Sequence, residues 1–271
     1  TVGGKILGEI HQIDYYNNNK LQILFNTKDS LYLLDRNGKN VEDFPIKLIN
    51  RAITGHTLLD YDNTRKYRIL IPSEDKMVYN YDKTGTLVKG WEFEKMIEKI
   101  TQPLKYHIQN QKDYIYAIDN AGNGKIIGRN GKKRIDLGKI PLIDAFYIDK
   151  NNGYVYTTDK QANVWLTDLK GNQTKIKTNT ISQPYYFIAE NINKDELTEF
   201  IIAKNTLNCY QLEAEIFSVN IQSEHIPSIF YFNNQTLIGV NHEDNIYLLK
   251  SNGEIYPGMP LYGKGLFNCM D

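Results

Sequence analysis

The chain has 271 residues, of which 41% are hydrophobic and 24% charged, and its 32 basic and 32 acidic residues leave no net charge. That balance argues against a nucleic-acid partner, which calls for a basic surplus. Apolar runs such as 114–118 are far too short to span a bilayer as a helix. The first residue is Thr, so we expect a processed or trimmed product of a longer chain.

One short phrase occurs twice along the chain. RNGKNVEDFPI at 36–46 returns as SNGEIYPGMPL at 251–261. Between Gly38 and Gly253, similar glycine turns recur at a period of roughly 43 residues, and in the fifth copy Glu213 stands near the lost glycine. The chain therefore holds six copies of one unit, with approximate bounds 7–50, 51–100, 101–140, 141–182, 183–223 and 224–265.

Each copy contains four short runs that read as strands. The runs are rich in Ile, Val, Tyr and Leu and are bounded by Gly, Asn and Asp, which is typical of strands in hairpins. Asn-Gly between two runs predicts a type I′ turn. The second and third runs are almost continuously apolar, which predicts burial on both faces, and the fourth is the least apolar, which suits an exposed edge.

One segment departs from this pattern. WEFEKMIEKI at 91–100 could place Trp91, Met96, Ile97 and Ile100 on a single face. That spacing predicts one short helix in the connection between the second and third copies.

Four antiparallel strands per unit, repeated six times, predict an all-β fold, a β-propeller with four-stranded blades. Six blades are expected, with seven as the alternative, because the run from Phe267 to Asp271 resembles the start of another unit. We expect a single monomeric propeller domain over 1–271, excised from a longer chain.

The units resemble the integrin-α-like propeller repeats of the FG-GAP and VCBS type, with some likeness to PQQ-type propellers. The likeness lies in an acidic polar loop, a hairpin ending in Gly, and an outer strand with Pro or Gly, and it covers about the whole chain. The resemblance implies a protein that is periplasmic, secreted or attached to the cell surface. The richness in Asn, Lys, Ile and Tyr suggests a bacterial source. A cytoplasmic location stays open.

The resemblance also implies calcium loops between the first two strands, because such repeats often carry oxygen ligands at alternate loop positions. The best match is NINKDELTE, which offers Asn191, Asn193, Asp195 and Glu199. The second is DYDNTRKYR, which offers Asp60, Asp62 and Thr64 but has Arg68 at the ninth position. The alternative is a polar loop that keeps Asp and Asn for Asx-turns and binds no metal. No other cofactor is expected.

No catalytic constellation is recognisable. The five histidines, at 11, 56, 107, 225 and 242, form no metal-binding spacing, and no nucleophile or phosphate-binding motif is present. His56 and His107 fall near first runs, which line the channel of a propeller, and we interpret them as polar channel side chains. The protein is therefore predicted not to be an enzyme.

The predicted function is a binding scaffold for a protein or a glycan. Loops joining one blade to the next and turns between second and third strands should crowd one face, and function usually lies on such loops. They include 47–55, 72–76, 241–245 and the neighbourhood of Tyr185, Tyr186 and Phe187. The alternative function is a carbohydrate-binding or carbohydrate-processing propeller, suggested by the 20 tyrosines.

Overall fold

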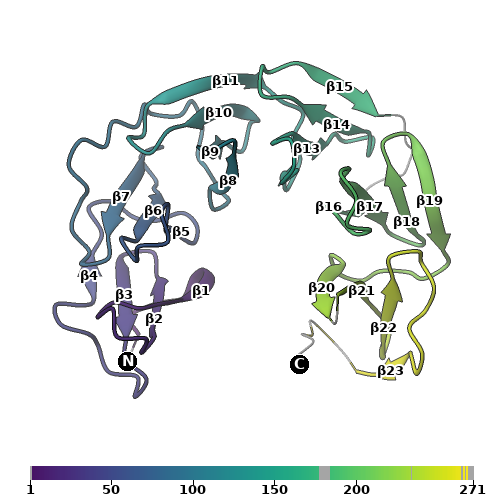
Figure 1. Cartoon of the computed structure of the whole chain (residues 1–271), viewed down its shortest axis with the longest axis horizontal. Coiled ribbons are helices and arrows are strands. Elements are labelled where there is room, and N and C mark those ends of the chain that lie inside the picture. The colour runs from purple at the N-terminus through teal and green to yellow at the C-terminus, as the bar shows by residue number, and fades with distance from the viewer. Residues whose placement is uncertain (1, 177–183, 233, 264, 266, 268–271) are drawn as a thin grey trace. The chain divides into compact units, whose positions relative to one another are not determined.

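The computed structural model describes residues 2–176, 184–232, 234–263, 265 and 267, and all regular structure in these ranges is β (Figure 1). The chain divides into two compact units, Thr1–Ile140 and Pro141–Asp271. Each unit contains three antiparallel sheets among its described residues. In each sheet, strands that follow one another in the chain pair side by side.

The N-terminal unit begins with a four-stranded sheet: β1 (Leu7–Ile13), β2 (Gln22–Asn26), β3 (Ser30–Leu34) and β4 (Ile46–Lys47). The second sheet has three strands: β5 (Thr57–Leu59), β6 (Arg68–Pro72) and β7 (Val78–Asp82). The third has four: β8 (Lys105–Gln109), β9 (Lys112–Ile118), β10 (Asn123–Ile127) and β11 (Lys133–Lys139). In the second sheet the predicted fourth strand is reduced to one bridge between Tyr81 and Leu87.

The C-terminal unit contains three four-stranded sheets. The first comprises β12 (Tyr147–Ile148), β13 (Val155–Thr158), β14 (Val164–Thr167) and β15 (Gln173–Ile176). The next comprises β16 (Tyr186–Glu190), β17 (Glu199–Ala203), β18 (Leu207–Gln211) and β19 (Ala214–Val219). The last comprises β20 (Ser228–Phe232), β21 (Gln235–His242), β22 (Asn245–Lys250) and β23 (Leu261–Tyr262).

The repeat of four-stranded units is thus confirmed for five sheets, and the second retains its fourth segment as a single bridge. The predicted boundary at 182/183 and the run 268–271, on which a seventh unit rests, lie outside the described residues. The expectation of one domain over 1–271 stays a prediction.

The two copies of the repeated phrase fold alike. After Gly38 the chain makes a bridge between Leu34 and Asn40, and after Gly253 it makes one between Leu249 and Ile255. The predicted type I′ turn is wrong: in the first copy Gly38 takes a positive φ of 75°, whereas Asn37 does not take a positive φ. Asp35 explains this turn, because its carboxylate accepts the amide N–H of Asn37 at 2.8 Å and binds the backbone two residues ahead in an Asx-turn.

The helix predicted at 91–100 is absent, and the segment is irregular. Met96 and Ile100 are buried against the next sheet, in a cluster with Ile115. Ile97 points the other way and is 69% exposed. Packing against a neighbouring sheet has therefore overridden a local helical pattern, as tertiary contacts commonly do.

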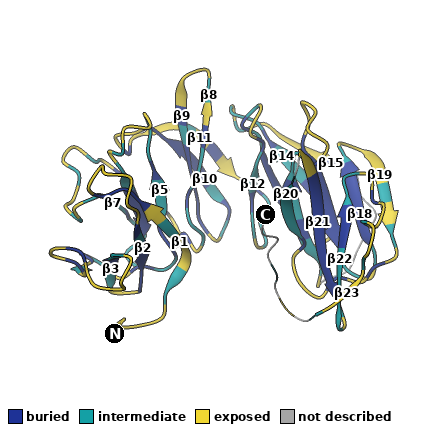
Figure 2. Cartoon of the chain, turned by 60° about the horizontal axis from the view of Figure 1, so that its bottom comes forward, coloured by how far each residue is buried: buried dark blue, intermediate teal, exposed yellow. Residues whose placement is uncertain are grey.

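Within each unit, the core lies between successive sheets. The second and third strands are the most buried, as Figure 2 shows for β2 and β21, and every residue of β17 is buried. Fourth segments cover the turn glycine of the following sheet: Ile46 lies on Gly85, Trp91 on Gly131 and Phe217 on Gly253. These three side chains are half-buried, so each contributes less than the roughly 1.5–3 kcal/mol of a fully buried one.

Candidate functional site

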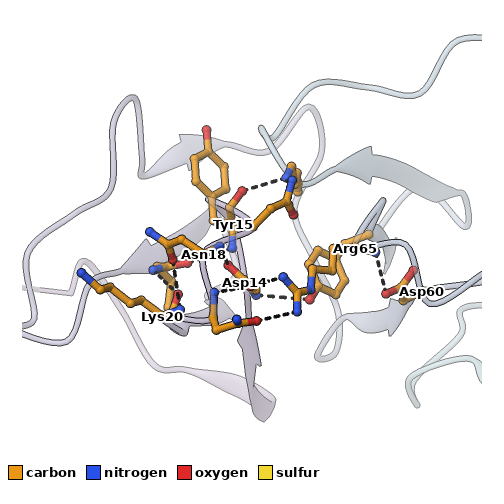
Figure 3. Close-up of polar contacts among 11 residues, drawn as sticks. Asp14, Tyr15, Asn18, Lys20, Asp60 and Arg65 are labelled. Atoms are coloured by element: carbon orange, nitrogen blue, oxygen red, sulfur yellow. Dashed lines mark hydrogen bonds and ion pairs between the residues drawn. The ribbon is translucent and has the colours of Figure 1, made fainter.

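The loop after β1 is closed by Asp14, which is 2% exposed. Its carboxylate accepts the amide N–H of Asn18 at 2.9 Å and of Asn19 at 2.8 Å. Arg65, from the corresponding loop of the second sheet, adds an ion pair at 2.6 Å, and its other terminal nitrogen donates to Asn19 Oδ1 at 2.7 Å (Figure 3). Burial acts to raise the pKa of Asp14, but these donors outweigh it and hold the pKa below its usual value. One arginine therefore joins two consecutive loops.

In the second sheet, the carboxylates predicted to bind calcium also accept hydrogen bonds or form ion pairs within the protein. Asp60 accepts the amide N–H of Thr64 at 3.0 Å and of Arg65 at 2.9 Å. Asp62 pairs with Arg129 Nη1 at 2.9 Å, and Arg129 also pairs with the buried Asp113. Backbone amides and a guanidinium thus contact the oxygens proposed for a metal ion.

The predicted site at 191–199 is also internally bonded. Glu199 Oε2 accepts the amide N–H of Ile192 at 2.7 Å, and Asp195 Oδ1 accepts that of Leu197 at 2.7 Å. Gln211 donates to both carboxylates, at 2.7 Å to Asp195 and 2.8 Å to Glu199. Asn191 donates to the carbonyl of Asp195.

The pKa values of the two carboxylates in this loop are shifted in opposite directions. Burial raises the pKa of Glu199 in spite of its donors, whereas the amide of Leu197 and the side chain of Gln211 lower that of Asp195. In the described ranges, no group of three or more His, Cys, Asp or Glu could hold a metal ion. Calcium stays a prediction, and the contacts favour the alternative of loops closed by their own Asp and Asn side chains.

The connecting segments do run beside the turns between second and third strands. In the N-terminal unit, Ala52 donates its amide N–H to Lys28 O at 2.8 Å, and Glu74 donates to Arg51 O at 2.9 Å. A third bond joins Met96 N–H to Lys76 O at 3.0 Å. We call this surface the loop face of the N-terminal unit; it consists of residues 27–30, 48–53, 73–76 and 95–100.

The loop face of the N-terminal unit combines paired charges with exposed apolar side chains. Three ion pairs join its segments: Lys28 to Glu74 at 2.7 Å, Arg51 to Asp29 at 2.9 Å and Lys76 to Glu98 at 3.3 Å. Among them Ile49 is 61% exposed and Ile97 is 69% exposed. The three pairs are neutral, and the surface as a whole has five basic and four acidic residues, so it is nearly neutral and also exposes apolar side chains.

The predicted loops of the C-terminal unit are arranged similarly. Glu224 donates its amide N–H to Asn241 O at 3.2 Å, and its carboxylate accepts that of Glu243 at 2.8 Å. The aromatic neighbourhood is less exposed than the sequence suggested, because Phe187 is buried and Tyr185 is half-buried with its hydroxyl donating to Asp159 O at 2.7 Å.

A histidine pair lies on the first strands of the N-terminal unit. His11 Nδ1, on β1, is 3.0 Å from Nε2 of the buried His56, which precedes β5. The sequence pointed to His56 and His107 instead; His107 lies against the ring of Tyr114, with 6.1 Å between ring centroids. A signal for His11 was present, because His11 and His56 are separated by about one repeat.

The chain matches no protein-family model, and no curated protein matches it. Solved structures do resemble it. The designed Ika8 protein gives a TM-score of 0.63 at 13% identity over 96% of this chain and 75% of that one. A lead-soaked crystal of BBS1N in complex with ARL6DN gives 0.58 at 9% identity, over 92% and 76%. Its mercury-soaked counterpart gives 0.58 at 9%, over 91% and 75%.

At these identities the likeness shows the fold alone. Together with the six sheets found among the described residues, it confirms the prediction of an all-β, propeller-type architecture. The resemblance to FG-GAP and VCBS repeats stays a prediction. No helix in the described part of the chain is long and apolar enough to cross a membrane.

Proposed function

We propose that this protein is a non-enzymatic scaffold that binds a protein partner through the loop face of its N-terminal unit. The observation that carries the proposal is the pair of exposed isoleucines, Ile49 and Ile97, in consecutive connecting segments. An apolar centre surrounded by polar residues is the general make-up of a protein interface. A fold neighbour, BBS1N, was crystallised in complex with a protein, ARL6DN, which supports this class of function.

Rigidity favours the same surface. Backbone hydrogen bonds join the connecting segments to the turns on either side of them. The ion pair between Lys28 and Glu74 adds a link between two sheets. A surface fixed before binding loses less conformational entropy when a partner docks.

The test is affinity capture from an extract of the source cells with three purified proteins: the wild-type chain, the double variant Ile49→Asp/Ile97→Asp, and Leu21→Asp. Leu21 is a matched control, because it is also exposed but lies in the loop between β1 and β2. We expect the wild type and Leu21→Asp to retain at least one protein in similar amounts. The double variant should retain about tenfold less of it. Equal retention by all three would contradict the proposal.

We also propose that the protein is bacterial and works outside the cytoplasm, in the periplasm, at the cell surface or secreted. The support for the location is the resemblance of its units to FG-GAP and VCBS repeats, and the support for a bacterial source is the Asn-, Lys-, Ile- and Tyr-rich composition. Fractionation of cells that express the full gene tests this, and recovery with a cytoplasmic marker would refute it.

A further inference from the structure

The histidine pair lies at the wall of a cavity of about 330 Å³ in the N-terminal unit. The first strands of three consecutive sheets contribute to it, and its lining includes Glu9, His11, His56, Leu58, Gln102 and Lys105. The Thr57 hydroxyl donates to Leu104 O at 2.7 Å and so joins the second and third sheets there. This volume lies at the lower end of the range of small-molecule sites, about 300–1,000 Å³.

A chain of hydrogen bonds fixes which nitrogen of each ring carries a hydrogen. Asn26 Nδ2 donates to the carbonyls of Thr27 at 3.1 Å and Thr54 at 3.2 Å. Its Oδ1 therefore faces His56 Nδ1, at 3.0 Å, and can only accept. His56 Nδ1 must carry the hydrogen, and His56 Nε2 is left as an acceptor.

The same reasoning extends to His11. Because His56 Nε2 accepts, His11 Nδ1 donates to it across 3.0 Å. In the neutral ring the remaining nitrogen of His11, Nε2, is then an acceptor, and it lies 3.7 Å from Glu9 Oε2. The cavity thus has two acceptors side by side on β1: His11 Nε2, oriented by the buried His56 and Asn26, and the carboxylate of the exposed Glu9.

The charged side chains of the lining leave it without a net charge. Glu9 and Lys105 carry opposite charges, so together they favour neither an anionic nor a cationic ligand. Hydroxyl groups both donate and accept, and they suit a wall with carboxylate, imidazole, amide and ammonium groups. Leu58, Pro103 and Leu104 supply an apolar floor for the carbon face of a ring.

We propose that this cavity binds a neutral polyhydroxylated ligand of about the size of one sugar ring, with His11 Nε2 and Glu9 accepting hydrogen bonds from adjacent hydroxyls. This site is separate from the loop face of the N-terminal unit and does not depend on the function proposed for it. His56 and Asn26 act as positioning residues that orient His11.

Calorimetric titration and saturation-transfer NMR test the proposal with glucose, galactose, mannose, fucose and N-acetylglucosamine, and with acetate and ethylammonium as charged probes. We expect saturable binding of at least one sugar, weakened about tenfold or more in His11→Ala and in Gln102→Ala. His242→Ala is the matched control, because its side chain is as exposed as that of His11, 28%, and also lies near a glutamate. The control should bind like the wild type.

Three results would overturn the proposal: no sugar binds, a charged probe binds while the sugars do not, or sugar binding is unchanged in both cavity variants. If His11→Ala does not fold, Gln102→Ala decides alone. Capture by the loop face in Ile49→Asp/Ile97→Asp and sugar binding in His11→Ala are independent measurements, so either function can fail without the other.

Discussion

Ile46 lies against Gly85 so closely that a Cβ added to the glycine would stand 2.4 Å from Ile46 Cγ1. Gly85 also has a φ of +79°, which disfavours other residues. The contact joins the outer segment of the first sheet to the turn between the third strand and fourth segment of the second. The equivalent glycine of the first sheet, Gly38, has a similar φ of +75° but no atom within 4 Å of its added Cβ.

Gly85→Ala should therefore destabilise the fold by about 2–4 kcal/mol, and Gly38→Ala by about 1 kcal/mol, because only the first adds a clash to the backbone strain. Urea unfolding measures both. In an Ile46→Ala background, Gly85→Ala should lower the free energy of unfolding by an amount closer to that for Gly38→Ala. A cost that stays unchanged would show that the contact with Ile46 is not the cause.

The ion pair of Arg65 with the buried Asp14 should matter far more than a surface pair. Arg65→Met leaves the Asp14 carboxylate without its guanidinium, and losing one partner of a buried pair is costly. Arg51→Met is the control, because Arg51 and Asp29 are both more than half exposed. We expect the urea midpoint to shift roughly three times more for Arg65→Met, and equal shifts would argue against a role for burial.

Calcium should have little effect on stability. The carboxylates at 60–64 and 191–199 already accept amide, side-chain or guanidinium donors, so a calcium ion would have to displace them. We expect the melting temperature to be the same in calcium and in a chelator, for the wild type and for Glu199→Gln. A rise of several degrees with calcium, lost in Glu199→Gln, would establish the predicted metal site.

The buried His56 should make the fold acid-sensitive. Burial, helped by the nearby His11, lowers its pKa to about 3, whereas the unfolded chain takes up the proton near pH 6.5. The stability that this difference provides is present above pH 6.5 and is lost as pH falls toward 3, by about 3 kcal/mol at pH 4.5.

Two measurements check this prediction. Urea unfolding at pH 7 and 4.5 should show a smaller loss of stability in His56→Asn than in the wild type. Nitrogen-15 NMR should show that Nδ1 of His56 keeps its hydrogen and that Nε2 stays unprotonated down to pH 5. Protonation of His56 near pH 6.5 would contradict both expectations.

The strands were predictable because they depend on local pattern. Apolar runs bounded by glycine turns recur along the chain, and nearest-neighbour pairing follows from the short turns. The contacts that connect sheets were not predictable. Asp14 and Arg65 meet only after two loops have taken their conformations, and the tautomers of His11 and His56 depend on the amide of Asn26.

The failed helix at 91–100 has the same explanation. Met96 and Ile100 satisfy a helical spacing, but the cluster with Ile115 offers them more burial than an isolated short helix would. The segments 60–67 and 191–198 do lie between the first and second strands of their sheets, whereas their role as calcium ligands stays a prediction. Their partners could be identified only from the structure, because those partners include backbone amides of the loops and, for Asp62, an arginine of the next sheet.

A chain made of similar copies risks pairing the wrong neighbours as it folds. The glycine turns cannot prevent this, since nearly every copy has one. Arg65 and Arg129 differ from the turns, because each meets carboxylates at one position of the N-terminal unit. A misplaced copy would leave the buried Asp14 without Arg65, or would separate Asp62 from Arg129, and such penalties reject wrong arrangements. These arginines therefore mark which copy belongs next to which, and their removal should increase misfolding during refolding.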